Sequence, residues 1–447
     1  MEKMTGDVNN GFNDPATIPH GYVYRSQKGR YPWWVNSVDK ITTPVDVSTW
    51  ERKTTDMILM TQVMQGPLRE EGLTRLEKGR ARMLEKMRSN APGSRIQDFA
   101  LHYASETYFA AGTDMFTLSL IMKFLKINEI VGTLIHPPDE LGVPRWEGSE
   151  KEASAMVEAA GIHLGASQVG FTGLNPWCLE ANVHISSSVE KIKTTEDGQV
   201  LVPEDMKYVI VLAAQVPMEA QYRAPSQIGD AADRSGYENR QMAMERMINF
   251  IRGLGYKAKP IPGMIPPVIP LALMAGLGEM GRMNRLISPL YGGAIRLEAL
   301  VTDLPLALDK PIDFGLQEFC RGCKKCAMAC PANALSMDDD PSWEPKGVYS
   351  TPGKKVWYDD GERCSSYSAS THIYCGACLG ACPWNKDNKT ALHSVSRAMG
   401  ATMPSLSPFM VFMDDLFGYG LVPEQRMNEW WDLKLPNKGF DSSRTRS

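Results

Sequence analysis

The cysteines of this chain are distributed very unevenly, and this distribution constrains the fold more than any other feature. Of nine cysteines in 447 residues, eight lie between Cys320 and Cys382, and Cys178 stands alone. A disulfide scaffold is usually a small secreted domain with cysteines spread along its length. Eight thiols confined to one short part of a long chain are typical of metal ligands instead.

The first four of these cysteines form a regular motif. They follow the spacing C-x2-C-x2-C-x3-C and are followed by proline, at Cys320, Cys323, Cys326, Cys330 and Pro331. This is the bacterial ferredoxin run, in which three thiolates hold one [4Fe–4S] cluster and the fourth ligates the neighbouring cluster. Zinc sites rarely need four cysteines at this spacing. The motif therefore predicts iron–sulfur ligation.

The second motif departs from the regular pattern. Regular spacing would place a cysteine at position 372, where the chain has His372, so Cys364 must supply the missing ligand from upstream. His372 as a ligand is the alternative. Crossed ligation then predicts two groups of ligands, called here set 1 (Cys320, Cys323, Cys326 and Cys382) and set 2 (Cys330, Cys364, Cys375 and Cys378). The remaining Cys178 is expected to be a buried core thiol.

Composition narrows the class of protein. The chain is 43% hydrophobic and 22% charged, which is typical of globular domains. Its net charge of -4 and the lack of a Lys/Arg-rich run argue against nucleic acid as a partner. The most apolar stretch, 264–277, is too short and too rich in proline to span a bilayer, so we expect a buried loop and helix. With no signal core and no Arg-Arg pair, either the chain is cytoplasmic or a targeting segment has been removed.

Hydrophobic periodicity indicates alternating helices and strands in the middle of the chain. Helices are expected at 69–90, 98–128 and 237–254, and a buried strand at 207–216. Ser149 and Glu152 form a capping box for a helix that we expect to end at Gly161. This alternation predicts an α/β core.

The same reading divides the chain into four parts. An N-terminal arm and helical unit, 1–140, is expected to cover the active site, with arm aromatics that pin it down or wall a pocket. The core follows at 141–310, and the cysteine-rich unit occupies 311–400. The aromatic tail, 401–447, is expected to pack back on the core.

Two adjacent clusters form a short electron-transfer chain. Such a chain must deliver its electrons to an acceptor, which we expect in the part of the protein upstream of the cysteines. No Gly-x-Gly-x-x-Gly follows a predicted strand and no Walker loop is present, so nicotinamide, flavin and nucleotide sites of those kinds are unsupported. None of the seven histidines lies in an Asp-x-His-x-x-Gly context. A corrinoid would therefore bind without that lower ligand.

Several segments resemble one family, the respiratory reductive dehalogenases. They are Gly292–Leu306, Asp309–Gly315 before the first cysteine motif, Leu254–Ala258, Ala275–Gly278 and Met413–Gly420. The truncated second cysteine motif also looks like that family. The resemblance covers about 145–432, and the first 140 residues match loosely.

The resemblance implies an α/β (α+β) fold: a nitroreductase-like core that binds a base-off cobamide, a ferredoxin-like domain with two [4Fe–4S] clusters, and an irregular N-terminal arm. It implies reductive removal of halide from a small organohalide, with electrons passing from an outer to an inner cluster and then to cobalt. It also implies cobamide contacts at Met264, Gly276, Gly278, the Ile287-Ser288-Pro289 turn and Leu297.

Two residues match the family's catalytic positions. Tyr237 matches its tyrosine proton donor and Arg296 the basic residue beside it. A nearby guanidinium favours phenolate and so eases proton transfer near neutral pH. The alternatives are a helix-start tyrosine packed in the core and a structural ion pair for Arg296, with Asp233 and Arg234 as capping residues.

One departure from the family concerns the pocket. Relatives often carry a polar pair where this chain has Gly263–Pro266, so we expect a more apolar pocket suited to small chlorinated alkanes. By resemblance, the partners are a small membrane anchor protein and an upstream electron donor, with a possible homodimer. The implied location is the outer face of the cytoplasmic membrane, as a peripheral protein.

Two alternative functions remain open at this stage. A cobamide-dependent epoxyqueuosine reductase has a similar core and clusters, but it acts on tRNA and should present a basic surface. A non-catalytic two-cluster electron carrier would leave the long upstream part without a role.

Overall fold

The computed structural model describes residues 16–27, 29–46, 48–50, 69–95, 138–139, 144–262, 267–347, 349–386 and 391–435. The helix expected at 98–128 and the residue Met264 lie outside these ranges. The helix expected at 69–90 is confirmed as α2, Arg69–Arg88.

The core is a four-stranded sheet in the order β2-β6-β10-β7, with antiparallel neighbours. Its strands are β2 (Gln168–Gly173), β6 (Tyr208–Gln215), β10 (Ile295–Thr302) and β7 (Ala258–Pro260). Every residue of β2, β6 and β10 is buried, which explains the continuous apolar run that predicted β6. The sheet therefore needs cover on both faces.

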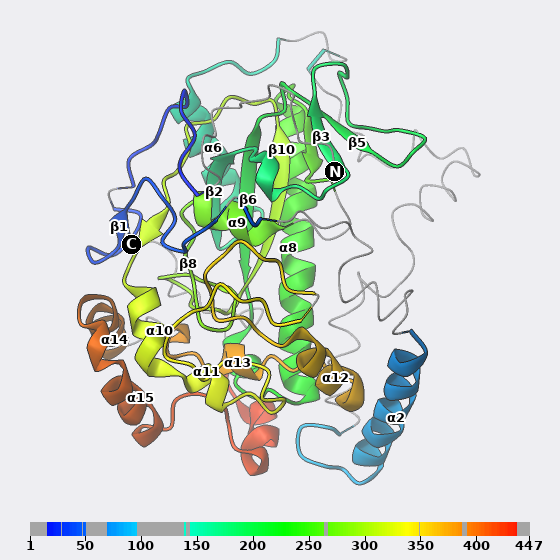
Figure 1. Ribbon diagram of the computed structural model, residues 1–447, viewed down its shortest axis with the longest axis vertical. Helices are drawn as coiled ribbons and strands as arrows, with labels where there is room; N and C mark the ends of the chain where they lie inside the picture. Colours follow the sequence, from blue (N-terminus) through cyan, green and yellow to red (C-terminus); the bar gives the residue numbers. More distant parts are fainter. Residues whose placement is uncertain are drawn as a thin grey trace.

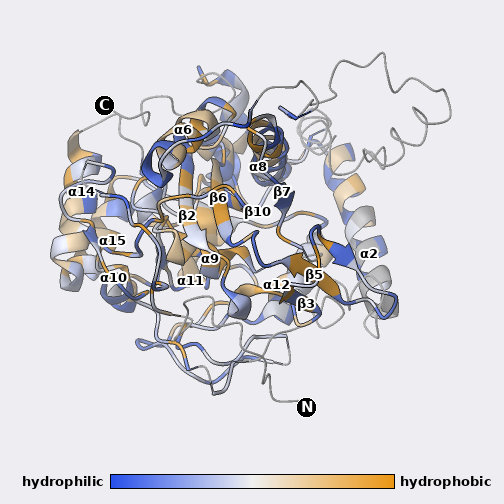
Figure 2. Cartoon of the chain, turned by 90° about the horizontal axis from the view of Figure 1, so that it is seen from above, coloured by the Kyte–Doolittle hydropathy of each residue, from blue (hydrophilic) through white to orange (hydrophobic). Residues whose placement is uncertain are grey.

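Both faces are covered, and the side-chain alternation of β6 decides which residues meet which layer. Ile210 and Leu212 pack with α6 (Glu150–His163) and α8 (Gln227–Gly253). Val209 and Val211 pack on the opposite face with α9 (Val268–Met274). Figure 2 shows the apolar strands between these helices. The expected α/β core is confirmed.

Two predicted helix boundaries are wrong. The capping box at Ser149 is present, but α6 continues past Gly161 to His163, because Gly161 packs inside against Val169. The helix expected at 237–254 begins ten residues earlier, at Gln227, where Ser226 caps it by accepting from the Gly229 N–H. Apart from Gln227 and Ile228, the buried positions of its first turns are Gly, Ala and Asp, so a repeating stripe of large apolar residues appears only further along.

Smaller elements complete the core. They are η2 (Pro176–Cys178), the small sheet of β3 (Val183–Ser186), β4 (Lys193–Thr194) and β5 (Val200–Pro203), α7 (Met218–Gln221), and the hairpin of β8 (Glu279–Met280) and β9 (Leu286–Ile287). The expected burial of Cys178 is confirmed, since its exposed fraction is 2%.

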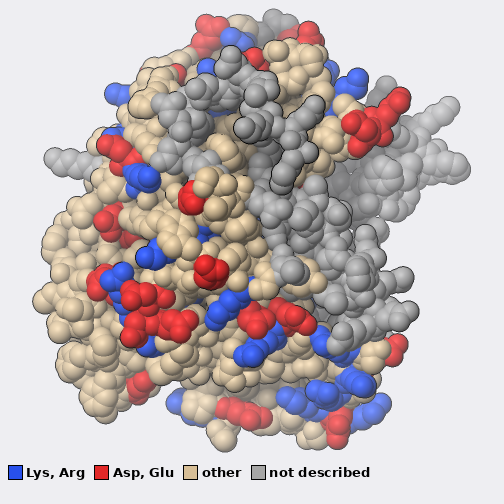
Figure 3. Space-filling model, viewed as in Figure 1, with Lys and Arg blue, Asp and Glu red and all other residues tan. Residues whose placement is uncertain are grey.

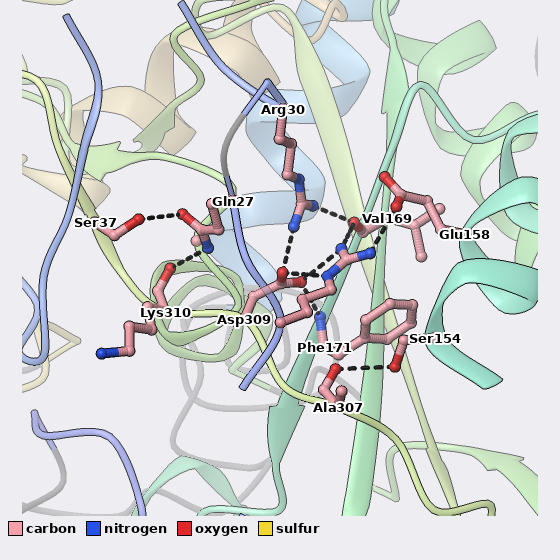
Figure 4. A network of polar contacts seen from close by, with 12 residues as sticks. Gln27, Arg30, Ser37, Ser154, Glu158, Val169, Phe171, Ala307, Asp309 and Lys310 are labelled. Carbon is pink, nitrogen blue, oxygen red and sulfur yellow. Dashed lines mark hydrogen bonds and ion pairs between the residues drawn. The ribbon is translucent and has the colours of Figure 1, made fainter. Parts of the chain in front are cut away.

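The described part of the N-terminal arm is irregular and is fastened to the core by charge. Its strand β1 (Asn36–Ser37) pairs with β11 (Ile312–Asp313). Arg25 Nε and Arg30 Nη1 each lie 2.5 Å from Asp309 Oδ1, and Asp309 Oδ2 accepts from the Phe171 N–H at 2.9 Å (Figure 4). The Asp309 side chain is fully buried, so this network joins the arm to β2 by a strong, water-excluded contact.

Several arm aromatics pin the arm to the core. The Tyr22 ring packs edge-on against Tyr208 at 5.6 Å, and the Tyr31 hydroxyl donates to Gly276 O at 2.6 Å. Trp34 is buried beside Trp384, with ring centroids 5.9 Å apart.

The cysteine-rich unit lies below the sheet in Figure 1, and α8 runs along the sheet down to its level. Its elements are α10 (Leu316–Cys323), α11 (Lys325–Met328), α12 (Gly361–Thr371), α13 (Ala377–Gly380) and η3 (Pro383–Asn385). Helix α2 packs against α12.

The tail contains α14 (Ala391–Thr402), η4 (Pro404–Leu406), α15 (Ser407–Leu416) and η5 (Glu424–Asp432). Val411 and Met427 are buried against the rest of the protein. Phe409, Phe412 and Phe417 are 54%, 60% and 61% exposed, so these three aromatic side chains take no part in the contact between the tail and the rest of the protein. They face outward because the buried side of α15 is formed by Ser407, Val411 and Asp414 instead.

Candidate functional site

Set 1 surrounds one cavity. Its four thiols line a small cavity together with the Arg282, Phe319 and Trp384 side chains. Cys320 and Cys323 lie on α10, and Lys324 in the left-handed conformation (φ 51°) breaks the helix so that α11 can turn Cys326 inward. Cys382 arrives from the other motif, directly before η3. The structure thus brings together the four cysteines that crossed ligation assigns to one cluster.

The chemistry of these thiols suits a metal cluster. Burial raises the pKa of Cys320 to about 12 and that of Cys323 to about 11. Iron is bound by thiolate, so a metal must supply the positive charge that deprotonates them. Among the described residues no group of His, Cys, Asp and Glu is placed to hold a single metal ion. The four thiols of set 1 line one cavity, which fits a multi-atom cluster.

Set 2 is also assembled, in a more open place. The pKa values of Cys375 and Cys378 are raised to about 12, mainly by burial and in smaller part by the nearby Cys330 and Cys364. Cys364 is exposed on α12, and the other three are half-buried. His372 lies at the C-cap of α12 in the left-handed conformation (φ 58°). Ligation by the eight cysteines of the two sets stays a prediction, which the grouping supports.

Tyr237 and Arg296 are brought together from different elements. Tyr237 lies in the middle of α8, not at a helix start, and Arg296 lies on β10 with its guanidinium 5.1 Å from the Tyr237 ring centre. A Cβ at Gly236 would lie 3.0 Å from Arg296 Cγ, so a glycine is needed for β10 to approach α8 this closely.

Asp233 is the residue that sequence analysis misjudged. It is not a capping residue: it lies inside α8, 4% exposed, and forms an ion pair with Arg296. Burial raises the pKa of Asp233, and the positive charge of Arg296 opposes that rise. The spacing of Asp233 and Tyr237 places both on one helix face, a signal that could have linked them had the helix been extended far enough. Arg234 pairs with Asp230 at 3.2 Å, which is also not a capping role.

This group borders set 2. The Tyr374 ring, next to Cys375, packs edge-on against Tyr237 with centroids 6.5 Å apart. A Cβ at Gly376 would meet Gln221 Nε2 at 2.4 Å and Asp233 Oδ1 at 3.7 Å. Gly376 has φ 61°, a conformation that favours glycine. The loop of set 2 therefore lies directly against the Tyr237 region.

The remaining predicted cofactor contacts are scattered around the β8–β9 hairpin and β10. A Cβ at Gly276 would meet Lys310 O at 2.3 Å, and one at Gly278 would meet Ile287 O at 2.2 Å, so backbone packing already requires both glycines. The Ser288 hydroxyl donates to Gln168 Oε1 at 2.7 Å. Leu297 belongs to the apolar core on the α9 side of the sheet. Pro289 follows β9 in the turn to Leu290. Their contact with a cofactor stays a prediction.

Two buried donors near Arg296 are left without partners. Arg296 Nε and Gln215 Nε2 make no hydrogen bond within the described structure. Gln215 ends β6 directly opposite Ile295, the first residue of β10, so both donors lie at the same end of the sheet. Unpartnered buried donors are costly, and they suit a bound group that carries acceptor atoms.

Comparison with known proteins places these features in a family. A family model described as "Reductive dehalogenase subunit" matches residues 30–185 and 179–306. The chain belongs to the reductive dehalogenase family. A second model, "4Fe-4S double cluster binding domain", matches residues 319–385, which include all eight cysteines of sets 1 and 2. The protein thus has two [4Fe–4S] clusters.

Named relatives share part of the chain. A tetrachloroethene reductive dehalogenase of Sulfurospirillum multivorans is 34% identical over 314 residues, covering 66% of this chain and 62% of that protein. One of Desulfitobacterium hafniense is 38% identical over 226 residues, covering 49% of this chain and 41% of the relative. The chain thus spans less than two thirds of the length of either relative. An epoxyqueuosine reductase of Lactococcus garvieae is 31% identical over only 32% of this chain.

Solved structures share the fold. A reductive dehalogenase described as B12-dependent superposes with a TM-score of 0.63 at 23% identity, covering 91% of this chain and 52% of that one. A catabolic reductive dehalogenase in complex with 3-bromo-4-hydroxybenzoic acid gives 0.61 at 24% identity, with 91% and 52% covered. Together with the two-cluster model, these matches confirm the predicted fold class.

Two further observations concern the surface. Within the described residues no helix is both long and apolar enough to cross a membrane. On the face shown in Figure 3, Lys and Arg side chains are interspersed with Asp and Glu, and no patch of one sign dominates it.

Proposed function

We propose that this protein is a reductive dehalogenase that replaces a halogen of a small organohalide by hydrogen. The reaction takes two electrons and one proton and releases one halide ion. The observation that carries the proposal is the contact between the Tyr237–Arg296–Asp233 group and the loop of set 2. An electron source and a proton source then lie side by side.

The electron path follows from that placement. Set 2 is the inner cluster because Cys375 follows Tyr374, which packs on Tyr237. Set 1 is the outer cluster. Helix α11, which carries Cys326, packs against α13, which carries Cys378 of set 2, so the two sets lie side by side.

A cobamide at the Tyr237 end of the sheet fits the residues present. The amide groups around a corrinoid ring carry acceptors for the unpartnered Arg296 Nε and Gln215 Nε2. Contacts from Gly276, Gly278 and the turn after β9 remain part of this proposal. Reduced cobalt supplies the electron pair that breaks the inert carbon–halogen bond.

The residues of the chain handle the proton. Tyr237 donates the proton of its hydroxyl to the carbon that loses halide, leaving a phenolate. Arg296, 5.1 Å from the ring centre, stabilises that phenolate by its positive charge. Asp233 positions Arg296 through their buried ion pair. Bulk water must then return the proton to Tyr237, whose half-buried position allows this.

The substrate class is narrowed by sequence. Tetrachloroethene and trichloroethene are the substrates named for the relatives. The apolar Gly263–Pro266 stretch supports small chlorinated alkanes for this chain. By family, we further propose a small membrane anchor protein, an upstream electron donor, homodimerisation, and a peripheral position on the outer face of the cytoplasmic membrane.

The test is halide release by protein reconstituted anaerobically with iron, sulfide and a cobamide, and reduced with a viologen. We expect chloride from chlorinated alkanes or alkenes only when the cobamide is present, and a loss of at least about 100-fold in Tyr237→Phe. Tyr256→Phe is the matched control, because the Tyr256 hydroxyl donates to Trp146 O at 2.9 Å, away from set 2.

Other outcomes would redirect the proposal. Cobalt-loaded protein with eight irons that releases no halide, but reduces epoxyqueuosine in tRNA, would contradict it. Protein that takes up iron but no cobamide would instead be an electron carrier.

A further inference from the structure

Arg282 is the largest fully buried side chain of the described structure, and it borders the cavity of set 1. It lies in the turn between β8 and β9 with 1% of its surface exposed. Its guanidinium also stacks over the Trp357 ring, 4.6 Å from the centroid. The mechanism proposed above assigns it no role.

All hydrogen bonds of Arg282 in the described structure end on main-chain carbonyls. Nε and Nη2 donate to Cys320 O at 2.9 and 2.7 Å, and Nη2 also donates to Arg321 O at 3.1 Å. Nη1 donates to Ser336 O at 2.9 Å and to Asp338 O at 2.7 Å. These bonds satisfy the N–H groups, but none of them supplies negative charge.

No carboxylate within the described residues forms an ion pair with Arg282 to neutralise it. The acid with the largest electrostatic effect on it is Asp339, whose side chain is 79% exposed and pairs with Lys324. The other groups with a favourable electrostatic effect on Arg282 are the thiols Cys320, Cys326 and Cys323, which carry negative charge only as metal-bound thiolates. A buried charge without a counter-charge is strongly unfavourable, so this guanidinium calls for an anion in the cavity it lines.

Two other buried cations of this region, Lys325 and Lys386, are already compensated, since both pair with Asp414. Lys325 lies 3.1 Å from Asp414 and 2.8 Å from Asp415. The arginine near set 2, Arg285, is half exposed and lies 3.6 Å from Asp359. Arg282 therefore differs from these cations, because it is deeply buried and forms no ion pair within the described structure.

We propose that Arg282 is the counter-charge of the cluster held by set 1, and that it raises the reduction potential of this cluster above that of the set 2 cluster. A cluster with four thiolates is an anion and gains a further negative charge on reduction. A fixed cation in a low-dielectric site stabilises the reduced form more than the oxidised form. The outer cluster then fills first and stores one electron ready for the inner cluster.

A structural role must be separated from this electrostatic one. Cys320 O and Arg321 O are carbonyls of the last turn of α10, which lack partners within the helix. Arg282 therefore caps α10 whether or not a cluster is bound. Arg282→Lys keeps the charge and loses most of the hydrogen bonds, whereas Arg282→Gln loses the charge and keeps some of them.

The experiment is a potentiometric titration of the iron-loaded protein followed by electron paramagnetic resonance. The signal of the set 1 cluster is identified as the one altered in Cys382→Ser. We expect Arg282→Gln to shift that potential downward, Arg282→Lys to shift it much less, and neither to move the set 2 signal. The control Arg285→Gln should leave the set 1 potential unchanged.

Equal shifts in the Gln and Lys variants, or none in either, would overturn the proposal, since the charge would then not matter. If neither variant loads iron, the order of the two reduction potentials in the wild-type protein tests the proposal instead. A set 1 cluster reduced at the higher potential supports the proposal, and coincident potentials or the reverse order contradict it. The inference rests on the two-cluster assignment, and a wild-type protein without eight irons would refute that assignment instead.

Discussion

The two sets of cysteines come from similar motifs but lie in different surroundings. In set 1, Cys320, Cys323 and Cys326 are 9%, 7% and 6% exposed and pack among aromatic side chains such as Phe319 and Trp384. In set 2, Cys364 is exposed, and its helix α12 has no buried residue. The motif specifies the expected ligands, whereas the tertiary packing encloses set 1 and leaves set 2 more exposed to solvent.

The largest expected contrast is between ligand replacements in the two sets. Cys326→Ser should abolish the set 1 cluster and also lower the yield of folded protein, because it disturbs a closed core. Cys364→Ser should remove only the set 2 cluster and leave the fold intact, because Cys364 lies at the surface. Iron content, with circular dichroism for folding, measures both effects. Equal loss of folded protein in the two variants would contradict the inference that only set 1 is part of a closed core.

The next effect concerns the polar group beside set 2. Asp233→Ala leaves Arg296 buried without its partner and should cost about 3–5 kcal/mol in the free energy of unfolding. The matched control is Glu298→Ala, which breaks the Arg240–Glu298 pair (2.6 Å) between the same two elements, α8 and β10. Arg240 is more exposed than Arg296, with 20% of its side-chain surface exposed against 10%, so the loss of this second pair should cost less than the loss of the first. Denaturant unfolding compares them, and equal costs would contradict the special burial of Asp233.

The smallest effect concerns a carboxyl group near set 1. Glu279 is 1% exposed, and burial raises its pKa from 4.5 to about 7. Hydrogen bonds donated by the Thr42 hydroxyl and by the Phe314 and Leu316 N–H groups act in the opposite direction and lower this pKa. Between these two pKa values the folded state holds a proton that the unfolded state has lost. Stability therefore falls as pH rises through this window, by up to about 3 kcal/mol from this group.

Replacing this carboxyl tests whether Glu279 makes the protein less stable as the pH rises. Glu279→Gln should flatten the decline in the free energy of unfolding between about pH 5.5 and about pH 8. The exposed Glu429→Gln, on η5, should keep the wild-type slope. A wild-type slope equal to that of Glu279→Gln over this window would show that Glu279 is ionised throughout.

Sequence alone was sufficient where short-range spacing carries the chemistry. The spacing of eight cysteines predicted two clusters and their crossed grouping, and the apolar run predicted β6. The capping box at Ser149 was correct because it needs only residues three apart. Such features depend on local backbone geometry, which neighbouring residues dictate.

Only the tertiary structure decided how distant residues meet. The start of α8 was missed because most buried residues of its first turns are Gly, Ala and Asp, which form no repeating stripe of large apolar side chains. Part of their burial comes from β10 and the set 2 loop, which pack against this end of the helix. The same packing turned Asp233 from a supposed cap into the partner of Arg296. It also placed Arg282, 38 residues before Cys320 in the chain, against the wall of the set 1 cavity. Burial and charge are properties of the assembled fold, so no periodicity or motif could have assigned these three residues their surroundings.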